Sequence, residues 1–215
     1  MPVRRVEPSL TVRLLMRALQ FFVATPVYLQ EHGRILAMIR LSEPSMAMHS
    51  NDVPGYKYQM WKTVKMPLYT NAHDIVNWIL WGINNSPEMY LDNVVINCHG
   101  ASGGVILGDK ELIFDESQPY EWLYAGNVGL FSSVKAKGSL GTIWLVACEV
   151  AKGAKGKAFC SALAKAAGCN VVAADKKQRV NFGFYLQSCP DNCIDNFEGR
   201  AYRWDRHGNQ EPFYD

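Results

Sequence analysis

Residues 94–100 (VVINCHG) and residues 143–148 (IWLVAC) decide the fold of this chain. Each segment begins as a short apolar run, which is typical of a buried strand in a parallel sheet. Each also ends in a residue capable of chemistry, His99 in the first and Cys148 in the second. Because ligands gather beyond the carboxyl ends of strands in open α/β sheets, the two side chains can meet in space.

Length and composition favour one large soluble domain, or a domain with a small appendage. The chain has 215 residues, of which 48% are hydrophobic and 20% are charged, as in an ordinary globular protein with a full core. The formal net charge is +2, and no basic run is dense enough to follow a phosphate backbone, so we expect no nucleic-acid partner. Either a local basic patch or solvated loops are formed by Lys152, Lys155, Lys157, Lys176, Lys177 and Arg179.

Six cysteines in a chain of this length do not make a disulfide scaffold, which favours a reducing compartment. We therefore expect a cytoplasmic protein, with export as an effector or toxin as the alternative. Cys189 and Cys193 flank a short loop and could pair or bind a metal ion. A zinc site needs a second pair of ligands, so we expect no metal and no other cofactor.

The first part of the chain predicts an N-terminal helical appendage over residues 1–33, with apolar positions between 10 and 22 and a stop at Pro26. Its apolar part is shorter than the roughly 20 residues of a membrane span. Because a basic start precedes it, a signal peptide is the alternative to a docked amphipathic helix. A strand over residues 34–41, a loop over 42–67 and a helix capped by Thr70 or Asn71 follow, the helix ending before Pro87.

The second part of the chain predicts a single α/β domain with a β-rich C-terminal tail. Its expected elements are a strand at 93–98, a hairpin of 105–107 with 111–114, a helix within 119–138, a strand at 142–147, a helix ending at Gly168, a strand at 170–174 and a tail hairpin of 198–204 with 210–214.

The two strand-end residues predict a cysteine hydrolase. Such an enzyme needs a thiolate, a proton donor for the leaving group and hydrogen-bond donors for the oxyanion. Cys148 is the candidate nucleophile, because it follows a buried strand and precedes a helix whose positive end and lysines favour the thiolate. His99 is the candidate proton donor. Gly100 lets the backbone approach closely, so its N–H is a candidate oxyanion donor beside that of Cys148.

The segments HGASGGVILGD (residues 99–109) and LVACEVAKGAKGKAFCSALAKAAGCNVVAAD (residues 145–175) resemble the caspase-like cysteine peptidase superfamily. The resemblance covers residues 93–179 and is closer to a bacterial branch of uncertain function found in large adhesin-like proteins. His99 lies 49 residues before Cys148, which is close to the spacing of about 50 found in caspases. The resemblance implies a three-layer caspase-like fold with a mostly parallel sheet flanked by helices. It also implies a His99–Cys148 dyad and an endopeptidase acting on protein or peptide substrates.

The chain departs from the superfamily at positions that set specificity. Val146 stands where metacaspases carry an aspartate, and Glu149 stands where caspases carry an arginine. An Asp-directed S1 pocket is therefore not supported. Asp175, after the next strand, is a candidate to line S1 and favour Arg or Lys, or is a loop or capping residue. Ser102 and Glu149 are the other candidates for substrate binding.

Two alternatives belong to other classes of protein. Residues 100–104 (GASGG) fit the G-x-S-x-G nucleophile elbow, with Ser102 as the nucleophile and Asp175 and His207 completing a triad. An elbow needs a helix after the serine, and the sequence here favours a β-hairpin, so we expect Ser102 to shape the turn. The second alternative is a catalytically silent interaction module on the same fold, which would bind partners through the first 90 residues and the tail.

Overall fold

The two apolar runs that end at His99 and Cys148 form neighbouring parallel strands in the middle of a seven-stranded sheet. A computed structural model describes residues 25–31, 34–53, 57–108, 121–178 and 191–213. The sheet is mixed. Five consecutive strands, from one edge to the centre, run parallel to one another, and each of the two tail strands pairs antiparallel with its neighbour. In spatial order it comprises β13 (Gln210–Pro212), β12 (Ala201–Trp204), β10 (Asn170–Ala174), β9 (Leu140–Val146), β5 (Leu91–Asn97), β3 (Ser45–His49) and β4 (Lys62–Lys65).

Both faces of this sheet are buried, which explains why its central strands are almost continuously apolar. Alternate residues point to opposite faces of a strand. In β5, Val94 and Ile96 join one hydrophobic core and Val95 joins the other. In β9, Ile143 and Leu145 lie on the first side and Trp144 on the second.

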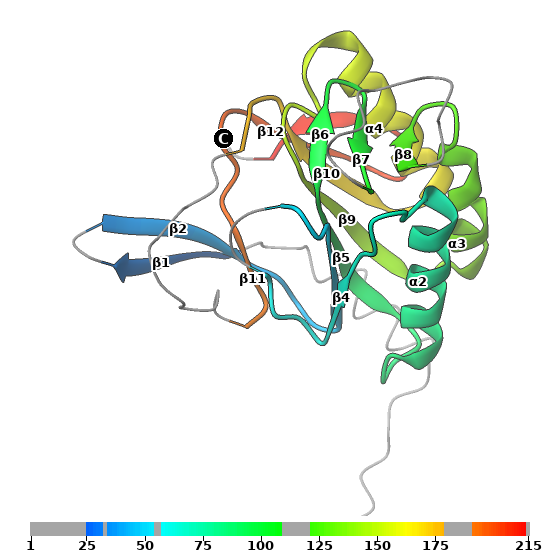
Figure 1. Cartoon of the computed structure of the whole chain (residues 1–215), viewed down its shortest axis with the longest axis horizontal. Helices are drawn as coiled ribbons and strands as arrows, with labels where there is room; N and C mark the ends of the chain where they lie inside the picture. Colours follow the sequence, from blue (N-terminus) through cyan, green and yellow to red (C-terminus); the bar gives the residue numbers. More distant parts are fainter. Residues whose placement is uncertain (1–24, 32–33, 54–56, 109–120, 179–190, 214–215) are drawn as a thin grey trace, which may run out of the picture.

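Helices cover the first face (Figure 1). They are α2 (Ala72–Asn85), the 3₁₀ helix η2 (Val128–Phe131), α3 (Ser132–Lys137) and α4 (Gly153–Ala167). Two predicted helix ends are confirmed. Asn71 caps α2, and its side chain accepts hydrogen bonds from the His73 and Asp74 N–H groups. Gly168 ends α4 with a φ of 67°. No helix in the described ranges is both long and apolar enough to cross a membrane.

The second face is covered by β structure. A three-stranded sheet pairs β1 (Thr25–Glu31), β2 (Arg34–Arg40) and β11 (Cys193–Asp195), and Met38, Ile39 and Ile194 from it pack in the second core. The predicted strand at 34–41 is confirmed, but it lies outside the central sheet (Figure 1). Within the predicted helical appendage 1–33, residues 25–31 form β1 instead, and the expected helical positions 10–22 lie outside the described residues.

A small sheet stands at the end of β5. It contains β6 (His99–Ala101), β7 (Gly104–Ile106) and β8 (Trp122–Tyr124), with β7 between the other two. Residues 111–114 of the predicted hairpin lie outside the described residues, and β7, which overlaps its first strand, pairs with β6 on one edge and β8 on the other. The helix predicted within 119–138 begins later than expected, because residues 122–124 form β8 and helical structure starts at residue 128. Asn127 binds the backbone of Trp122 and Tyr124, which closes a turn after a short strand there.

The predicted loop over 42–67 contains two strands of the central sheet, β3 and β4. All five residues of β3 are buried, between β5 and β4. The SMAMH sequence of β3 has no β-branched residue and no alternation, so strand propensity gives no signal for it. Its pairing with β5 overrides the local preference. The remaining predictions of the second half are confirmed: β5, β9, β10 and the tail hairpin of β12 and β13.

Candidate functional site

His99 and Cys148 emerge from the same end of adjacent strands. β5 and β9 are parallel, and Asn97 is paired with Val146 in their register. Each candidate residue follows its paired residue by two positions, at the carboxyl end of its strand. Both side chains are partly exposed, whereas the strand residues before them are buried. The topology therefore brings the two predicted residues to the same end of the sheet, as an α/β site requires.

Gly100 places the two chain segments in direct contact. A Cβ atom at this position would lie 2.8 Å from the carbonyl oxygen of Cys148 and 2.9 Å from the Cβ of Ala147. Only glycine allows that approach. Ala101 and Gly104 pair around a two-residue turn, which makes theirs the hydrogen-bonded pair, and such pairs alternate along the ladder. The N–H of Gly100 therefore points away from β7.

Cys148 lies at the start of a tight turn. The next residue, Glu149, has a φ of 58°, which side chains rarely adopt, and its N–H donates to the Lys176 carbonyl at 2.9 Å. The N–H of Cys148 makes no hydrogen bond to any part of the chain that the structure describes. The thiol itself contacts the carbonyl oxygen of Gln178, with Sγ at 3.9 Å. The backbone N–H of Cys148 can thus serve a ligand, while that of Glu149 cannot.

A carboxylate that the sequence did not indicate contacts His99. Asp52 lies in the loop after β3, and its Oδ2 is 3.3 Å from the Nε2 of His99. Its Oδ1 accepts a hydrogen bond from the Ser50 hydroxyl at 2.6 Å. No sequence signal marks Asp52, because its segment reads as loop and the strand that positions it lacks a strand-like pattern.

The serine-elbow arrangement is not formed around Ser102. Ser102 occupies the turn between β6 and β7, so a strand follows it where an elbow requires a helix. Its hydroxyl donates to the carbonyl of Lys152 at 2.6 Å, which ties this turn to the loop after Cys148. Asp175 accepts a hydrogen bond from the N–H of Arg200 at 3.0 Å, and His207 lies in the turn between β12 and β13. Ser102 therefore shapes the turn, as expected.

Glu149 and Asp175 line one open pocket of about 960 Å³ beside the N-terminus of α4. Lys152, Lys176 and Lys177 line the same pocket, and the ammonium group of Lys152 is 2.7 Å from a carboxylate oxygen of Glu149. The predicted basic patch is therefore interleaved with carboxylates. Asp175 also holds the N–H of Arg200 in the segment before β12, which is the loop role considered for it.

Three other cysteines are poor nucleophiles. Cys98, Cys160 and Cys169 are buried, and burial raises the pKa of each thiol far above its ordinary value. Cys189 lies outside the described residues, and Cys193 is buried in β11. Within the ranges that the structure describes, no group of three or more His, Cys, Asp or Glu side chains could hold a metal ion.

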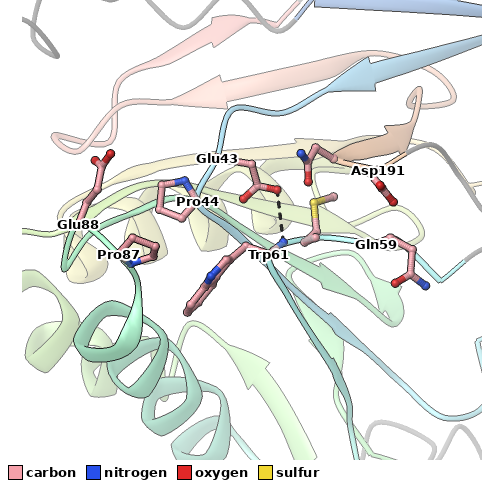
Figure 2. A pocket seen from close by; sticks show the side chains of 9 residues that line it. Glu43, Pro44, Gln59, Trp61, Pro87, Glu88 and Asp191 are labelled. Atoms are coloured by element: carbon pink, nitrogen blue, oxygen red, sulfur yellow. Dashed lines mark hydrogen bonds between the residues drawn. The ribbon is translucent and has the colours of Figure 1, made fainter.

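A second pocket lies at the opposite end of the sheet, so it is separate from His99 and Cys148. Its volume is about 540 Å³, and Glu43, Glu88 and Asp191 contribute carboxylates to its lining. Figure 2 shows Trp61 in its wall, with the backbone N–H of Trp61 donating to Glu43 at 3.3 Å. Burial, followed by the nearby charges of Asp92 and Asp191, raises the pKa of Glu43, although two backbone hydrogen bonds oppose the shift.

A family model described as a domain of unknown function (DUF4347) matches residues 55–178. The match includes β4, β5, β9 and β10, and thus both His99 and Cys148. No curated protein and no solved structure matches this chain.

Proposed function

We propose that this chain, which belongs to the DUF4347 family of domains of unknown function, is a cysteine endopeptidase of caspase-like fold. The observation that carries the proposal is that His99 and Cys148 follow adjacent parallel strands at the same end of the sheet, with Gly100 packed against the Cys148 backbone. A sheet buried on both faces holds these strands in place. The resemblance of residues 93–179 to the caspase-like superfamily supports the same assignment.

The proposed reaction has two steps. The thiolate of Cys148 attacks the carbonyl carbon of a peptide bond, the C–N bond breaks, and His99 gives its proton to the departing amine. The acyl group then remains on Cys148 as a thioester. His99 takes a proton from a water molecule, the oxygen of that water attacks the thioester, and the C–S bond breaks. The products are a carboxylic acid and an amine, and the Cys148 thiolate and the protonated His99 are restored.

Negative charge on the substrate oxygen needs donors that are not already used. The N–H of Cys148, which makes no hydrogen bond within the described part of the chain, is the first proposed donor. The N–H of Gly100, which points away from β7, is the second. Removing one such donor costs roughly 100- to 1,000-fold in rate in other hydrolases. Asp175 is the proposed contact for a basic side chain at P1 in the neighbouring pocket, where the carboxylate of Glu149 is already paired with Lys152.

The test is labelling by a library of peptidyl acyloxymethyl ketones on the full chain. Wild type, Cys148→Ala, His99→Ala and Ser102→Ala are compared at neutral pH, with Cys160→Ala as the matched control for a buried thiol. We expect labelling at Cys148 that is lost in Cys148→Ala, slowed in His99→Ala and unchanged in the Cys160 variant. Labelling that survives in Cys148→Ala would reject the assignment. Covalent reaction of Ser102 with a fluorophosphonate probe would instead indicate a serine hydrolase.

A second candidate function, a catalytically silent interaction module, is favoured by one surface feature. The side chains of Trp61 and Trp81 are 37% and 45% exposed, and their rings stack with centroids 6.5 Å apart. The ammonium group of Lys62 lies 5.1 Å from the Trp81 ring. Exposed aromatic side chains of this kind are common at protein interfaces. This function becomes the preferred one if neither probe reacts with the chain.

A further inference from the structure

We propose that Asp52 is a positioning residue that fixes the imidazole of His99 through its Nε2 atom. The assignment of the contact stands on geometry alone, whereas its consequence for Cys148 rests on the proposed cysteine peptidase function. Asp52 comes from a different element than either member of the dyad, since it lies in the loop after β3. Asp52 would then be the third residue of the site, orienting His99 beside Cys148.

The first observation is the environment of Nε2 on His99. This atom is enclosed, and among the residues that the structure describes it has no aligned hydrogen-bond partner. The Oδ2 of Asp52, at 3.3 Å, is within ion-pair distance. A buried polar atom without a partner is unfavourable, so a small ring rotation that aligns N–H with this carboxylate is favourable. Catalytic hydrogen bonds are often long in unliganded enzymes and tighten when substrate binds.

The second observation is that Asp52 is itself held. Its Oδ1 accepts the hydroxyl of Ser50 at 2.6 Å. Ser50 in turn donates its backbone N–H to the carbonyl of Asn97 at 2.9 Å, which is two residues before His99. The carboxylate is therefore tied to the same strand end that carries the histidine. Its side chain is 16% exposed, against 31% for His99, so solvent screens the contact only in part.

These contacts determine which nitrogen serves the thiol. A carboxylate accepts hydrogen bonds and cannot donate them when ionised, so Asp52 requires a proton on Nε2. The nitrogen that remains for exchange with Cys148 is Nδ1. The negative charge of Asp52 also stabilises the imidazolium that faces a thiolate. A purely structural role, in which Asp52 only holds its loop, would not couple to either property.

The first readout is the tautomer of His99, which does not depend on peptidase activity. Nitrogen-15 NMR of the imidazole rings is recorded on the full chain, with His99→Gln to assign the signal and thermal unfolding to show that each variant folds. We expect a protonated Nε2 in wild type and a mixture of tautomers in Asp52→Ala. Asp191→Ala, at the opposite end of the sheet, is the control and should leave the signal unchanged. An unchanged His99 signal in Asp52→Ala would overturn the proposal.

The second readout is the alkylation rate of Cys148 by iodoacetamide, measured by peptide mass spectrometry. We expect Asp52→Ala to slow it about tenfold, as the loss of a charge-assisted contact implies. In a His99→Ala background the same change should have no further effect, because Asp52 acts through His99. Equal slowing in both backgrounds would overturn the positioning role. If the tautomer depends on Asp52 but the rate never depends on His99, the peptidase function fails and the Asp52–His99 contact stands.

Discussion

At the scale of single residues, Gly100 has the least freedom at the candidate site. A methyl group there would lie 2.8 Å from the backbone oxygen of Cys148, and backbone cannot yield as a flexible side chain can. We predict that Gly100→Ala separates the ends of β5 and β9, destabilises the fold by about 1–3 kcal/mol and slows labelling of Cys148. Urea unfolding and probe labelling measure the two effects, with the adjacent Ala101→Ser as the control. Unchanged stability would show that the two segments are not in contact.

His49 is a second residue with a measurable consequence. It is 2% exposed, its Nε2 accepts the N–H of Tyr58 at 3.1 Å, and its Nδ1 lies 3.1 Å from the side-chain amide of Asn97. Burial lowers the pKa of His49 from 6.5 to about 4, and the charge of Lys57 acts in the same direction. The folded state therefore favours the neutral imidazole of His49, whereas in the unfolded chain this imidazole takes up a proton near pH 6.5.

This difference predicts a loss of stability on acidification. Between pH 6.5 and pH 4 the unfolded state binds more protons at His49 than the folded state, so the free energy of unfolding falls as the pH falls. From pH 7.5 to pH 5 the loss from this group is about 2 kcal/mol. Urea unfolding at both values measures it. His49→Gln should remove most of that pH dependence, and equal dependence in wild type and variant would contradict the assignment.

At the scale of elements, helix α2 depends on its cap. The Asn71 side chain accepts hydrogen bonds from two backbone N–H groups, and the carboxylate of Asp74 accepts one from the Asn71 N–H at 3.0 Å. We predict that Asn71→Ala lowers the free energy of unfolding by about 1 kcal/mol, because these donors lose their partner. Asn77→Ala, on the exposed face of the same helix, is the control and should have little effect. Equal losses in the two variants would refute the capping role.

Elements with a strong local signal were predictable, and elements fixed by distant pairing were not. The valine- and isoleucine-rich segments of β5 and β10, and the Asn71 cap, carry their structure in their own residues. The SMAMH strand β3 becomes a strand only because β5 and β4 pair with it. For the same reason the sequence marks His99, Gly100 and Cys148 as candidate site residues but does not mark Asp52, whose place depends on β3.

At the scale of the whole molecule, the tail is part of the core although the family match ends at residue 178. Strand β12 pairs with β10, and Trp204 within it is 1% exposed. Ile194 and Phe197 contribute to the second core. We predict that a chain ending at residue 178 loses cooperative unfolding, because one edge of the sheet and part of both cores are removed. Urea unfolding followed by fluorescence measures this, and an unchanged midpoint would contradict it.

The dyad itself is tested most directly by the rate at which iodoacetamide alkylates Cys148 in folded protein at neutral pH, in wild type and in His99→Ala. Cys160 serves as the internal standard, since it is fully buried and its raised pKa keeps it protonated. If the two residues form a catalytic pair, Cys148 reacts far faster than Cys160, and the loss of His99 slows Cys148 alone. A Cys148 rate that is equal in wild type and His99→Ala would contradict the pairing.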